Sequence, residues 1–391
     1  MIPVKLEYRH RAIMPSMNET MVSMPALHEA QFYERLPERE VRCTLCPHDC
    51  RIRDGGRGAC AVRFNHGGVL YTVVYDKVIA RDIDPVEKKP LLNFLPGSRA
   101  YSISTVGCNL RCAFCQNWEI SQWPKGMLPR AIDESDASKP AQPVCPQLAT
   151  IADAVMGEHV TPQQIVSSAL STACRSIAYT YTEPTVFYEL AYDAATLARA
   201  KGLKNICVTN GFISEAPLRK LATVLDAVNV DLKFFKPESY KRVSRARLEP
   251  ILEAIRLYRA LGVWVEVTTL VVPGLNDSDD ELHAIAEFLM SVGPEVPWHV
   301  SQFYPAWKML DRPVTPMATL RRAAEIGRHA GLRYVYEGNV PGEHGENTYC
   351  YACRALVIER YGYRVLSNRI RGGSCPECSA RIDGVEMSRD E

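Results

Sequence analysis

Three cysteines close together in the middle of the chain are the residues best suited to do chemistry. Cys108, Cys112 and Cys115 lie within the segment GCNLRCAFCQNW, at the spacing C-x₃-C-x₂-C. Structural zinc takes four ligands, and no fourth cysteine or histidine lies within reach in the sequence. A [4Fe–4S] cluster is usually held by four thiolates, so three thiolates leave one iron open to a chelating molecule. The spacing therefore predicts a [4Fe–4S] cluster with an open iron.

The elements around this segment predict a parallel sheet. β-rich runs alternate with segments that carry apolar residues at helical spacing, which is typical of strands joined by crossover helices. Ligands gather at the carboxyl ends of such strands, where Glu183, Asn210, Asp231 and Lys233 lie. Six β/α units fit an open barrel or a doubly wound sheet, and periodicity does not choose between them. The predicted strands are 101–107, 176–182, 204–209, 227–233, 263–272 and 298–304.

Several segments resemble a known family. GCNLRCAFCQNW resembles the signature of the radical S-adenosylmethionine (SAM) superfamily, in which SAM chelates the open iron. The chain more narrowly resembles the radical SAM enzyme of the AmmeMemoRadiSam system, a relative of the pyruvate formate-lyase activating enzymes. This resemblance runs from about Met24 to Val385 and implies an α/β fold with a partial (β/α)₆ barrel. The segments that carry it are CTLCPHDC, DPVEKKPLLNFLPGS, AYTYTEPTVFYE, VTNGF, VDLKFF, VPGLND and GNVPGEHGENTYC.

The resemblance implies which side chains contact SAM. Phe114 occupies the aromatic position before the third cysteine, which packs near the adenine. Asp231 and Lys233 match the Asp and Lys of a DLK stretch that lies beside SAM in the activating enzymes. A monovalent cation site in those relatives needs an Asp before TNG, where this chain has Val208. We therefore do not predict that ion.

Two further positions have a functional and a structural interpretation. Glu183 matches a carboxylate that contacts the SAM amino group, although the glycines that usually precede it are Tyr181 and Thr182 here. It could instead precede a helix that begins at Pro184 and stabilise its N-terminus. Asn210 could line the ribose, or it could belong to an ordinary turn after the strand.

A second group of cysteines lies near the N-terminus. Cys43, Cys46, Cys50 and Cys60, called here the N-terminal thiol set, have the spacing C-x₂-C-x₃-C-x₉-C, and His48 adds a spare ligand. Four thiolates suit structural zinc or an auxiliary [4Fe–4S] cluster. We expect structural zinc here, with an auxiliary [4Fe–4S] cluster and a set without metal as the alternatives.

A third group lies near the C-terminus. Cys350, Cys353, Cys375 and Cys378, called here the C-terminal thiol set, have the spacing C-x₂-C-x₂₁-C-x₂-C, which is close to that of a zinc ribbon. We expect structural zinc, with an electron-relay cluster as the alternative. The first knuckle, CYACR, lacks the Pro and Gly common in ribbons. The remaining cysteines are expected to be a loop thiol and two small buried side chains; these are Cys145, Cys174 and Cys207.

The domain organisation follows from these groups. We expect two small metal-binding modules of four cysteines each, one N-terminal and one C-terminal, on either side of the radical SAM barrel. The barrel contains an insertion rich in Pro, Ser, Ala and Asp. The predicted units are a disordered extension at 1–23, the N-terminal module at 24–97, the barrel at 98–340 with its insertion at 124–159, and a zinc-ribbon-like tail at 341–391.

Composition excludes several classes of partner. The 391 residues include 46 Lys and Arg against 45 Asp and Glu, a net charge of +1, so no overall field attracts nucleic acid or an anionic membrane. No apolar run is long enough to span a membrane, and the first residues are charged, unlike a signal peptide. Fourteen cysteines suggest metal ligands in a reducing compartment. We expect a cytoplasmic protein.

The predicted function is reductive cleavage of SAM to a 5′-deoxyadenosyl radical that abstracts hydrogen from an unidentified substrate. A glycyl-radical enzyme activase and a non-catalytic zinc-binding adaptor are the alternatives. No flavodoxin or ferredoxin domain is recognisable, so the electron is expected from a separate protein of that kind. The resemblance also suggests Memo-like and AMMECR1-like proteins as functional partners.

Overall fold

The computed structural model describes residues 27–127 and 151–388. Its centre is an eight-stranded sheet with the order β16-β15-β14-β13-β12-β11-β9-β8. All neighbouring pairs are parallel except β8 with β9. The strands are β8 (Ala80–Pro85), β9 (Arg99–Ser104), β11 (Ser176–Tyr179), β12 (Lys204–Thr209), β13 (Ala227–Asp231), β14 (Trp264–Val271), β15 (Trp298–Gln302) and β16 (Val335–Gly338).

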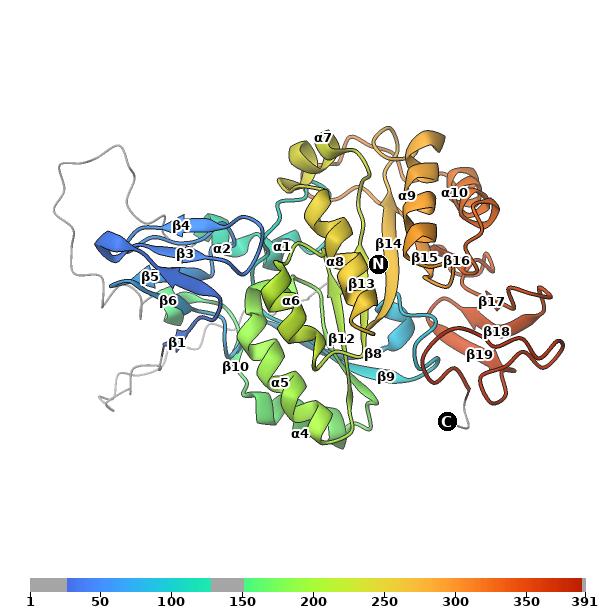
Figure 1. The fold of residues 1–391 in the computed structure, drawn as a ribbon, viewed down its shortest axis with the longest axis horizontal. Helices are drawn as coiled ribbons and strands as arrows, with labels where there is room; N and C mark the ends of the chain where they lie inside the picture. The colour runs from blue at the N-terminus through green and yellow to red at the C-terminus, as the bar shows by residue number, and fades with distance from the viewer. Residues whose placement is uncertain (1–26, 128–150, 389–391) are drawn as a thin grey trace, which may run out of the picture.

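Amphipathic helices cover one face of this sheet, and Figure 1 shows α5, α6, α8 and α9 in front of it. Helix α9 buries Leu282, Ile285, Ala286 and Leu289, which recur at helical spacing. The strands are buried nearly throughout, as expected for a parallel sheet. The main helices are α4 (Pro162–Ser171), α5 (Tyr188–Ala200), α6 (Glu215–Ala222), α8 (Glu249–Ala260), α9 (Asp279–Val292) and α10 (Met317–His329).

Short elements join the sheet to its loops. After the three-cysteine segment the chain forms two short helices, and a 3₁₀ turn begins directly after Glu183. These elements are η2 (Val86–Lys88), α1 (Trp118–Ser121), α2 (Trp123–Met127), η3 (Pro184–Phe187), α7 (Pro237–Ser239) and η4 (Tyr240–Ser244). No helix among the described residues is both long and apolar enough to cross a bilayer.

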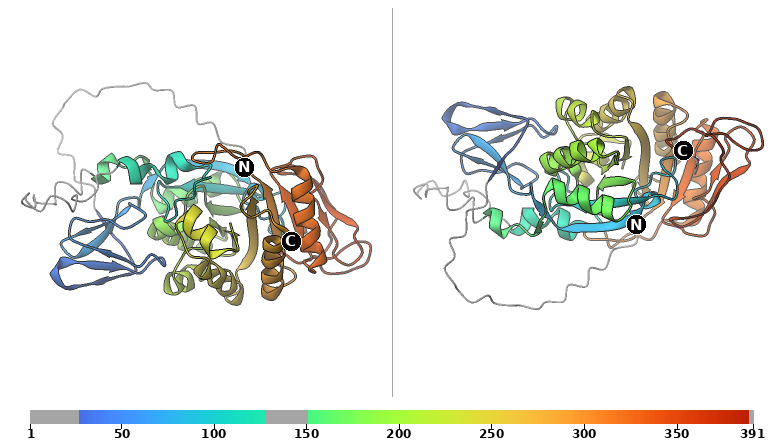
Figure 2. Two further views of the ribbon diagram at one scale, coloured as in Figure 1. Left: turned by 90° about the horizontal axis from the view of Figure 1, so that it is seen from above. Right: turned by 90° about the horizontal axis from the view of Figure 1, so that it is seen from below.

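The two cysteine-rich regions lie at opposite ends of the central sheet, as Figure 2 shows. The N-terminal region forms the sheets β1-β6-β5 and β2-β3-β4, and β7 pairs with β10. The C-terminal region forms β17-β18-β19. The strands are β1 (His28–Glu29), β2 (Tyr33–Arg35), β3 (Val41–Cys43), β4 (Cys50–Ile52), β5 (Arg63–His66), β6 (Val69–Thr72), β7 (Lys77–Val78), β10 (Glu158–His159), β17 (Thr348–Tyr349), β18 (Leu356–Tyr361) and β19 (Arg364–Asn368); a 3₁₀ turn, η1 (Pro37–Arg39), links β2 to β3.

The predicted α/β class with a mostly parallel sheet is confirmed. All six predicted strands are present, although the first begins at Arg99 and ends at Ser104, and the second ends at Tyr179. The sheet extends beyond them, because β16 adds a parallel strand at one edge and β8 an antiparallel strand at the other. The predicted extension 1–23, Cys145 and most of the insertion lie outside the described residues.

Candidate active site

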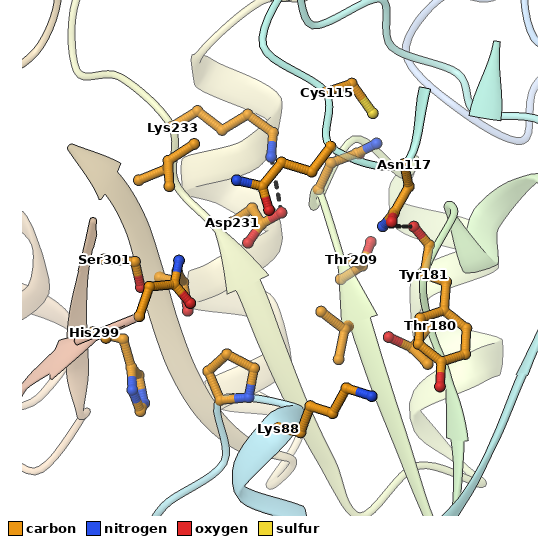
Figure 3. Close-up of a pocket in the computed structure, with 18 of the residues that line it drawn as sticks. Lys88, Cys115, Asn117, Thr180, Tyr181, Thr209, Asp231, Lys233, His299 and Ser301 are labelled. Atoms are coloured by element: carbon orange, nitrogen blue, oxygen red, sulfur yellow. Dashed lines mark hydrogen bonds and ion pairs between the residues drawn. The ribbon is translucent and has the colours of Figure 1, made fainter. Parts of the chain in front are cut away.

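One cavity of about 330 Å³ lies at the carboxyl ends of the parallel strands. A space of this size is within the range of small-ligand pockets. The structure brings together there every residue predicted at the cluster and SAM sites, and Figure 3 shows several of them. These residues are Cys108, Cys112, Phe114, Cys115, Glu183, Asn210, Asp231 and Lys233.

The three cysteines of the central segment, called here the three-thiol loop, follow β9. Each sulfur is within hydrogen-bond distance of at least one protein group, and N–H groups such as those near Cys108 stabilise a thiolate. The loop is also held from outside, because the backbone N–H of Arg111 donates to Ser244 O at 3.0 Å. In the shortest of these contacts the Leu110 N–H donates to Cys108 Sγ, the Cys112 thiol donates to Ser244 Oγ, and Cys115 Sγ pairs with Ser121 Oγ, each at 3.3 Å.

The electrostatics of the loop favour a positively charged ligand. Burial raises the pKa of Cys108 and of Cys115, so their thiolates require nearby positive charge. Lys125 supplies part of it: its ammonium donates to Leu110 O at 2.5 Å, and burial lowers its pKa. Sequence reasoning missed this lysine, because it lies ten residues beyond Cys115 in a helix whose position only the fold defines.

The spacing of the sulfurs fits a cluster. Tetrahedral zinc brings four ligand atoms together around one ion, whereas each thiolate of a [4Fe–4S] cluster binds a different iron. Among the described residues, no group of three His, Cys, Asp or Glu ligand atoms within 4.8 Å of one another includes the three-thiol loop. The residues present therefore fit a [4Fe–4S] cluster better than a single zinc ion.

Asp231 and Lys233 form an ion pair at the end of β13. Lys233 Nζ donates to Asp231 Oδ2 at 2.8 Å, and the two side chains point towards each other in Figure 3. Burial by itself would lower the pKa of Lys233, but the charges of Asp231 and Cys112 raise it above its ordinary value. Lys233 Nζ also lies 5.9 Å from the centre of the Phe114 ring. The pair thus places one carboxylate and one ammonium in the wall of the cavity that the three-thiol loop also lines.

Glu183 caps a 3₁₀ turn and also lines the cavity. It is the N-cap of η3, where Oε1 accepts from the Thr185 N–H at 3.0 Å, so the capping interpretation is what the structure shows. Oε1 also accepts from Thr209 Oγ1 at 2.7 Å, and Oε2 accepts from the Asn210 N–H at 2.8 Å. Burial raises its pKa despite these donors. Glu183 lines the cavity, and its predicted contact with SAM stays a prediction.

Asn210 forms a turn and contacts the three-thiol loop. Its Oδ1 accepts from the Phe212 N–H at 2.8 Å, which is the ordinary turn that we considered. Its Nδ2 lies 3.6 Å from Cys108 Sγ and donates to Asn109 Oδ1 at 2.9 Å. Gly211 follows with φ of 71°, where a Cβ would lie 2.8 Å from Val230. The amide of Asn210 therefore holds the loop, a role that the sequence did not reveal.

A charged cluster that the sequence did not explain borders the same cavity. Asp84 accepts from Lys88 Nζ at 2.6 Å and from Lys89 Nζ at 2.5 Å, and the Tyr181 hydroxyl donates to it. Despite burial, these partners hold the pKa of Asp84 well below its ordinary value, whereas burial lowers the pKa of Lys89 to about 8. The motif DPVEKKP thus joins β8 to the loop that follows β11.

His299 lines the cavity from β15. Its Nε2 lies 2.7 Å from Glu266 Oε2, and both side chains are buried. Its ring stacks on Tyr336 of β16, with ring centres 5.2 Å apart. Gly362 and Tyr363 of the C-terminal region also line the cavity, so this region is part of the wall.

The C-terminal thiol set has the geometry of a single-ion site. All four sulfurs lie within 4.8 Å of one another, and Cys350–Cys378 and Cys353–Cys375 are each 3.7 Å apart. A Zn–S bond of about 2.3 Å with tetrahedral angles places neighbouring sulfurs about 3.8 Å apart. The residues therefore fit zinc, and the electron-relay alternative fits less well.

The two knuckles of this set share one backbone conformation. In each, the N–H of the first cysteine donates at 2.9 Å to the carbonyl of a following alanine, Ala355 or Ala380. In each, the residue after the second cysteine has a positive φ, 63° at Arg354 and 62° at Ser379. The first knuckle thus adopts the ribbon turn although it lacks Gly. Burial opposes it, but the N–H groups of Glu377 and Cys378 lower the pKa of Cys375 to about 7.

The fold and this site define an α/β protein with a cysteine-lined cavity at its strand ends, and comparison with known proteins agrees. The model of the radical SAM superfamily matches residues 102–289. "Uncharacterized protein MJ0808" of Methanocaldococcus jannaschii is 43% identical over 362 residues, covering 92% of this chain and all of the relative. The chain belongs to the radical SAM superfamily.

Two further relatives share parts of the chain. Pyruvate formate-lyase 1-activating enzyme of Escherichia coli K12 is 28% identical over 107 residues, which are 27% of this chain and 44% of that enzyme. The crystal structure of a radical SAM methyltransferase from Sphaerobacter thermophilus aligns with a TM-score of 0.44 at 16% identity, covering 63% of this chain and 68% of that one. The chain is thus homologous to the pyruvate formate-lyase activating enzymes over a limited segment.

Proposed function

We propose that this protein cleaves SAM reductively to a 5′-deoxyadenosyl radical, which abstracts hydrogen from a substrate still to be identified. One observation carries the proposal: the three-thiol loop and the Asp231–Lys233 pair line the same cavity. When bound, the [4Fe–4S] cluster supplies the electron that breaks the bond between sulfur and the adenosyl carbon. Superfamily membership supports the proposal.

The protein's own residues would bind and orient SAM. Phe114 is buried and would pack against the adenine, while Asp231 and Glu183 offer carboxylates to an ammonium group. Lys233 offers a cation near the thiolates, and its pair with Asp231 holds both groups in place. Tyr363 from the C-terminal region lies in the cavity wall, where it would exclude water. A closed, dry site protects a radical from side reactions.

The narrower family and its context are part of the proposal. The motifs quoted above support membership of the AmmeMemoRadiSam group, with Memo-like and AMMECR1-like proteins as partners and a flavodoxin or ferredoxin as electron donor. The sulfur spacing of the C-terminal thiol set supports structural zinc there. A cytoplasmic location agrees with a chain rich in reduced cysteines.

The test uses the purified, anaerobic protein with reconstituted iron and sulfide. Given SAM and dithionite, it should release 5′-deoxyadenosine and methionine, measured by chromatography. Cys112→Ala should abolish this release, while the matched control Cys207→Ala, a buried cysteine outside the cavity, should retain it. A protein that holds iron and sulfide but forms no deoxyadenosine, with or without cell extract, would contradict the proposal.

Homology to pyruvate formate-lyase 1-activating enzyme keeps a glycyl-radical activase as the second candidate. Such an activase would generate a glycyl radical on a partner protein, detectable by electron paramagnetic resonance (EPR) after mixing. The zinc-binding adaptor needs single-ion geometry at the three-thiol loop. The sulfur spacing there does not support it.

A further inference from the structure

The N-terminal thiol set surrounds a second, smaller cavity of about 20 Å³. All four of its cysteines line this cavity, although they come from different elements: Cys43 ends β3, Cys50 begins β4, and the other two lie on loops. Cys43 and Cys50 are directly paired across the two strands. The fold thus gathers four thiols around a common space that is distinct from the SAM cavity.

The sulfur spacing separates this set from the C-terminal one. Among the described residues, only the C-terminal thiol set forms a group whose ligand atoms all lie within 4.8 Å of one another. The N-terminal sulfurs are spread more widely around their cavity, so one tetrahedral zinc ion would not reach them without rearrangement. A [4Fe–4S] cluster binds four thiolates at four separate irons and therefore needs a wider set.

Two donors at the cavity suit a negatively charged cluster. The Ala59 N–H lies 3.4 Å from Cys50 Sγ. Arg63 is 1% exposed and lines the cavity, and its terminal nitrogens bind Gln31 O at 2.9 Å and Glu189 Oε1 at 2.5 Å. Its Nε has no hydrogen-bond partner among the described residues. A buried N–H of a charged guanidinium needs an acceptor, and a cluster sulfide in the cavity would provide one.

The second cavity lies directly beside the three-thiol loop. Asn109 lines it, and the preceding residue, Cys108, lines the SAM cavity. Thr185, which donates to Glu183, also lines the second cavity. His48, between two cysteines of the N-terminal set, has Nε2 only 2.8 Å from Asn109 O. A covalent bond and a hydrogen bond thus connect the two sites.

We propose that the N-terminal thiol set holds a second, fully cysteine-ligated [4Fe–4S] cluster that passes electrons to the three-thiol loop. A reduced flavodoxin or ferredoxin gives one electron to the N-terminal site, which returns to its oxidised state when the electron moves on to the open-iron site. No bond forms and no proton moves in this transfer. The transfer, unlike the presence of the cluster, rests on the proposed function.

The first experiment counts iron, sulfide and zinc in the full-length protein. With all three thiols of the central loop changed to Ala, the protein should retain about four iron and four sulfide per chain, and the wild type should hold about eight of each. Cys174→Ala, at a buried cysteine that lines neither cavity, is the matched control and should equal wild type. A central-loop variant without iron but with a second zinc would overturn the proposal. This variant keeps the N-terminal module intact, so misfolding of that module cannot produce the result.

The second experiment tests the transfer with Cys50→Ala combined with Cys60→Ala. Deoxyadenosine release driven by reduced flavodoxin should be lost in this variant, whereas release driven by dithionite, a small reductant that can reduce the open-iron site without the N-terminal cluster, should persist. Equal loss or equal retention with both reductants would overturn the transfer. A wild type that releases no deoxyadenosine with either reductant would instead count against the proposed function, while the iron count would still decide the second cluster.

Discussion

The two terminal modules each present four cysteines, yet they differ in how those cysteines are held. In the C-terminal module, two equivalent knuckles bring the sulfurs to 3.7 Å, and two of the four cysteines are exposed. In the N-terminal module, strands and loops spread the sulfurs around a cavity against the central sheet. The difference teaches that the number of thiols does not define a metal site. Their separation and their neighbours do.

The largest expected effect comes from removing ligands of the zinc ion proposed at the C-terminal thiol set. Cys350→Ser combined with Cys375→Ser should release about one zinc per chain and unfold residues beyond β16, because structural zinc supplies about 10 kcal/mol or more to small modules. Limited proteolysis should then cleave the tail, with the intact N-terminal set as the internal comparison. Retention of a protected tail without zinc would mean that the hydrophobic contacts of Val357 and Ile358 suffice.

The next largest effect is expected from breaking the buried ion pair between Arg63 and Glu189 beside the N-terminal thiol set. Arg63→Met should lower the free energy of unfolding by about 3–5 kcal/mol, because it leaves the buried carboxylate of Glu189 without its partner. The matched change Arg333→Met at the C-terminal end removes a partly exposed pair with Asp383 and should cost at most about 1 kcal/mol. Thermal unfolding of the anaerobic proteins measures both. Equal losses would show that burial is not what separates the two pairs.

An acid-dependent effect is expected where the chain leaves the N-terminal module. The folded-state pKa of Asp84 lies below its ordinary value of 3.8, so its contribution to stability is present above that pH and is lost as the pH falls through the lowered pKa. Asp84→Asn should therefore lower the midpoint of thermal unfolding at pH 7, and the gap to wild type should narrow in acid. A gap that stays constant or grows in acid would contradict this sign.

The smallest effect tests the symmetry of the C-terminal knuckles. Arg354→Gly and Ser379→Gly should each raise stability by up to about 1 kcal/mol, since glycine adopts positive φ without the strain of a side chain. Ala355→Gly, next to the first of them, serves as the control and should not stabilise. The chelator concentration at which half of the zinc is released, measured for each variant and for wild type, gives the comparison. If one of the two glycine substitutions raised stability and the other lowered it, the two knuckles would not be equivalent.

Much of the central fold could be predicted from the sequence because periodicity is a local property. The six strands and the position of Glu183, Asn210 and Asp231 at strand ends follow from it. The strands β8 and β16 were missed as parts of this sheet, since short segments acquire their pairing only from neighbours distant in the chain. Lys125 was missed for the same reason. Nothing local indicates that its ammonium lies near Cys108.

The motifs that the sequence left unexplained became interpretable through long-range contacts. Asp84 meets Tyr181 across 97 positions of chain, and Tyr363 enters the wall of a cavity that Cys108 and Asp231 line from far earlier in the chain. Such contacts leave no periodic signal. The segment DPVEKKP can therefore be recognised as a motif in the sequence, but its contacts cannot be predicted from the sequence.

The sequence by itself was enough to predict the central site, because three thiols within eight residues lie close together in any fold and can offer three ligands to one metal group. It also determined that the chain alternates strands and helices. Only the tertiary structure decided what the outer cysteines can hold, because sulfur separation depends on how distant strands and loops pack. It also decided that Asn109 links the two cavities, since a loop of the central sheet becomes a wall of the N-terminal site only when the chain is folded.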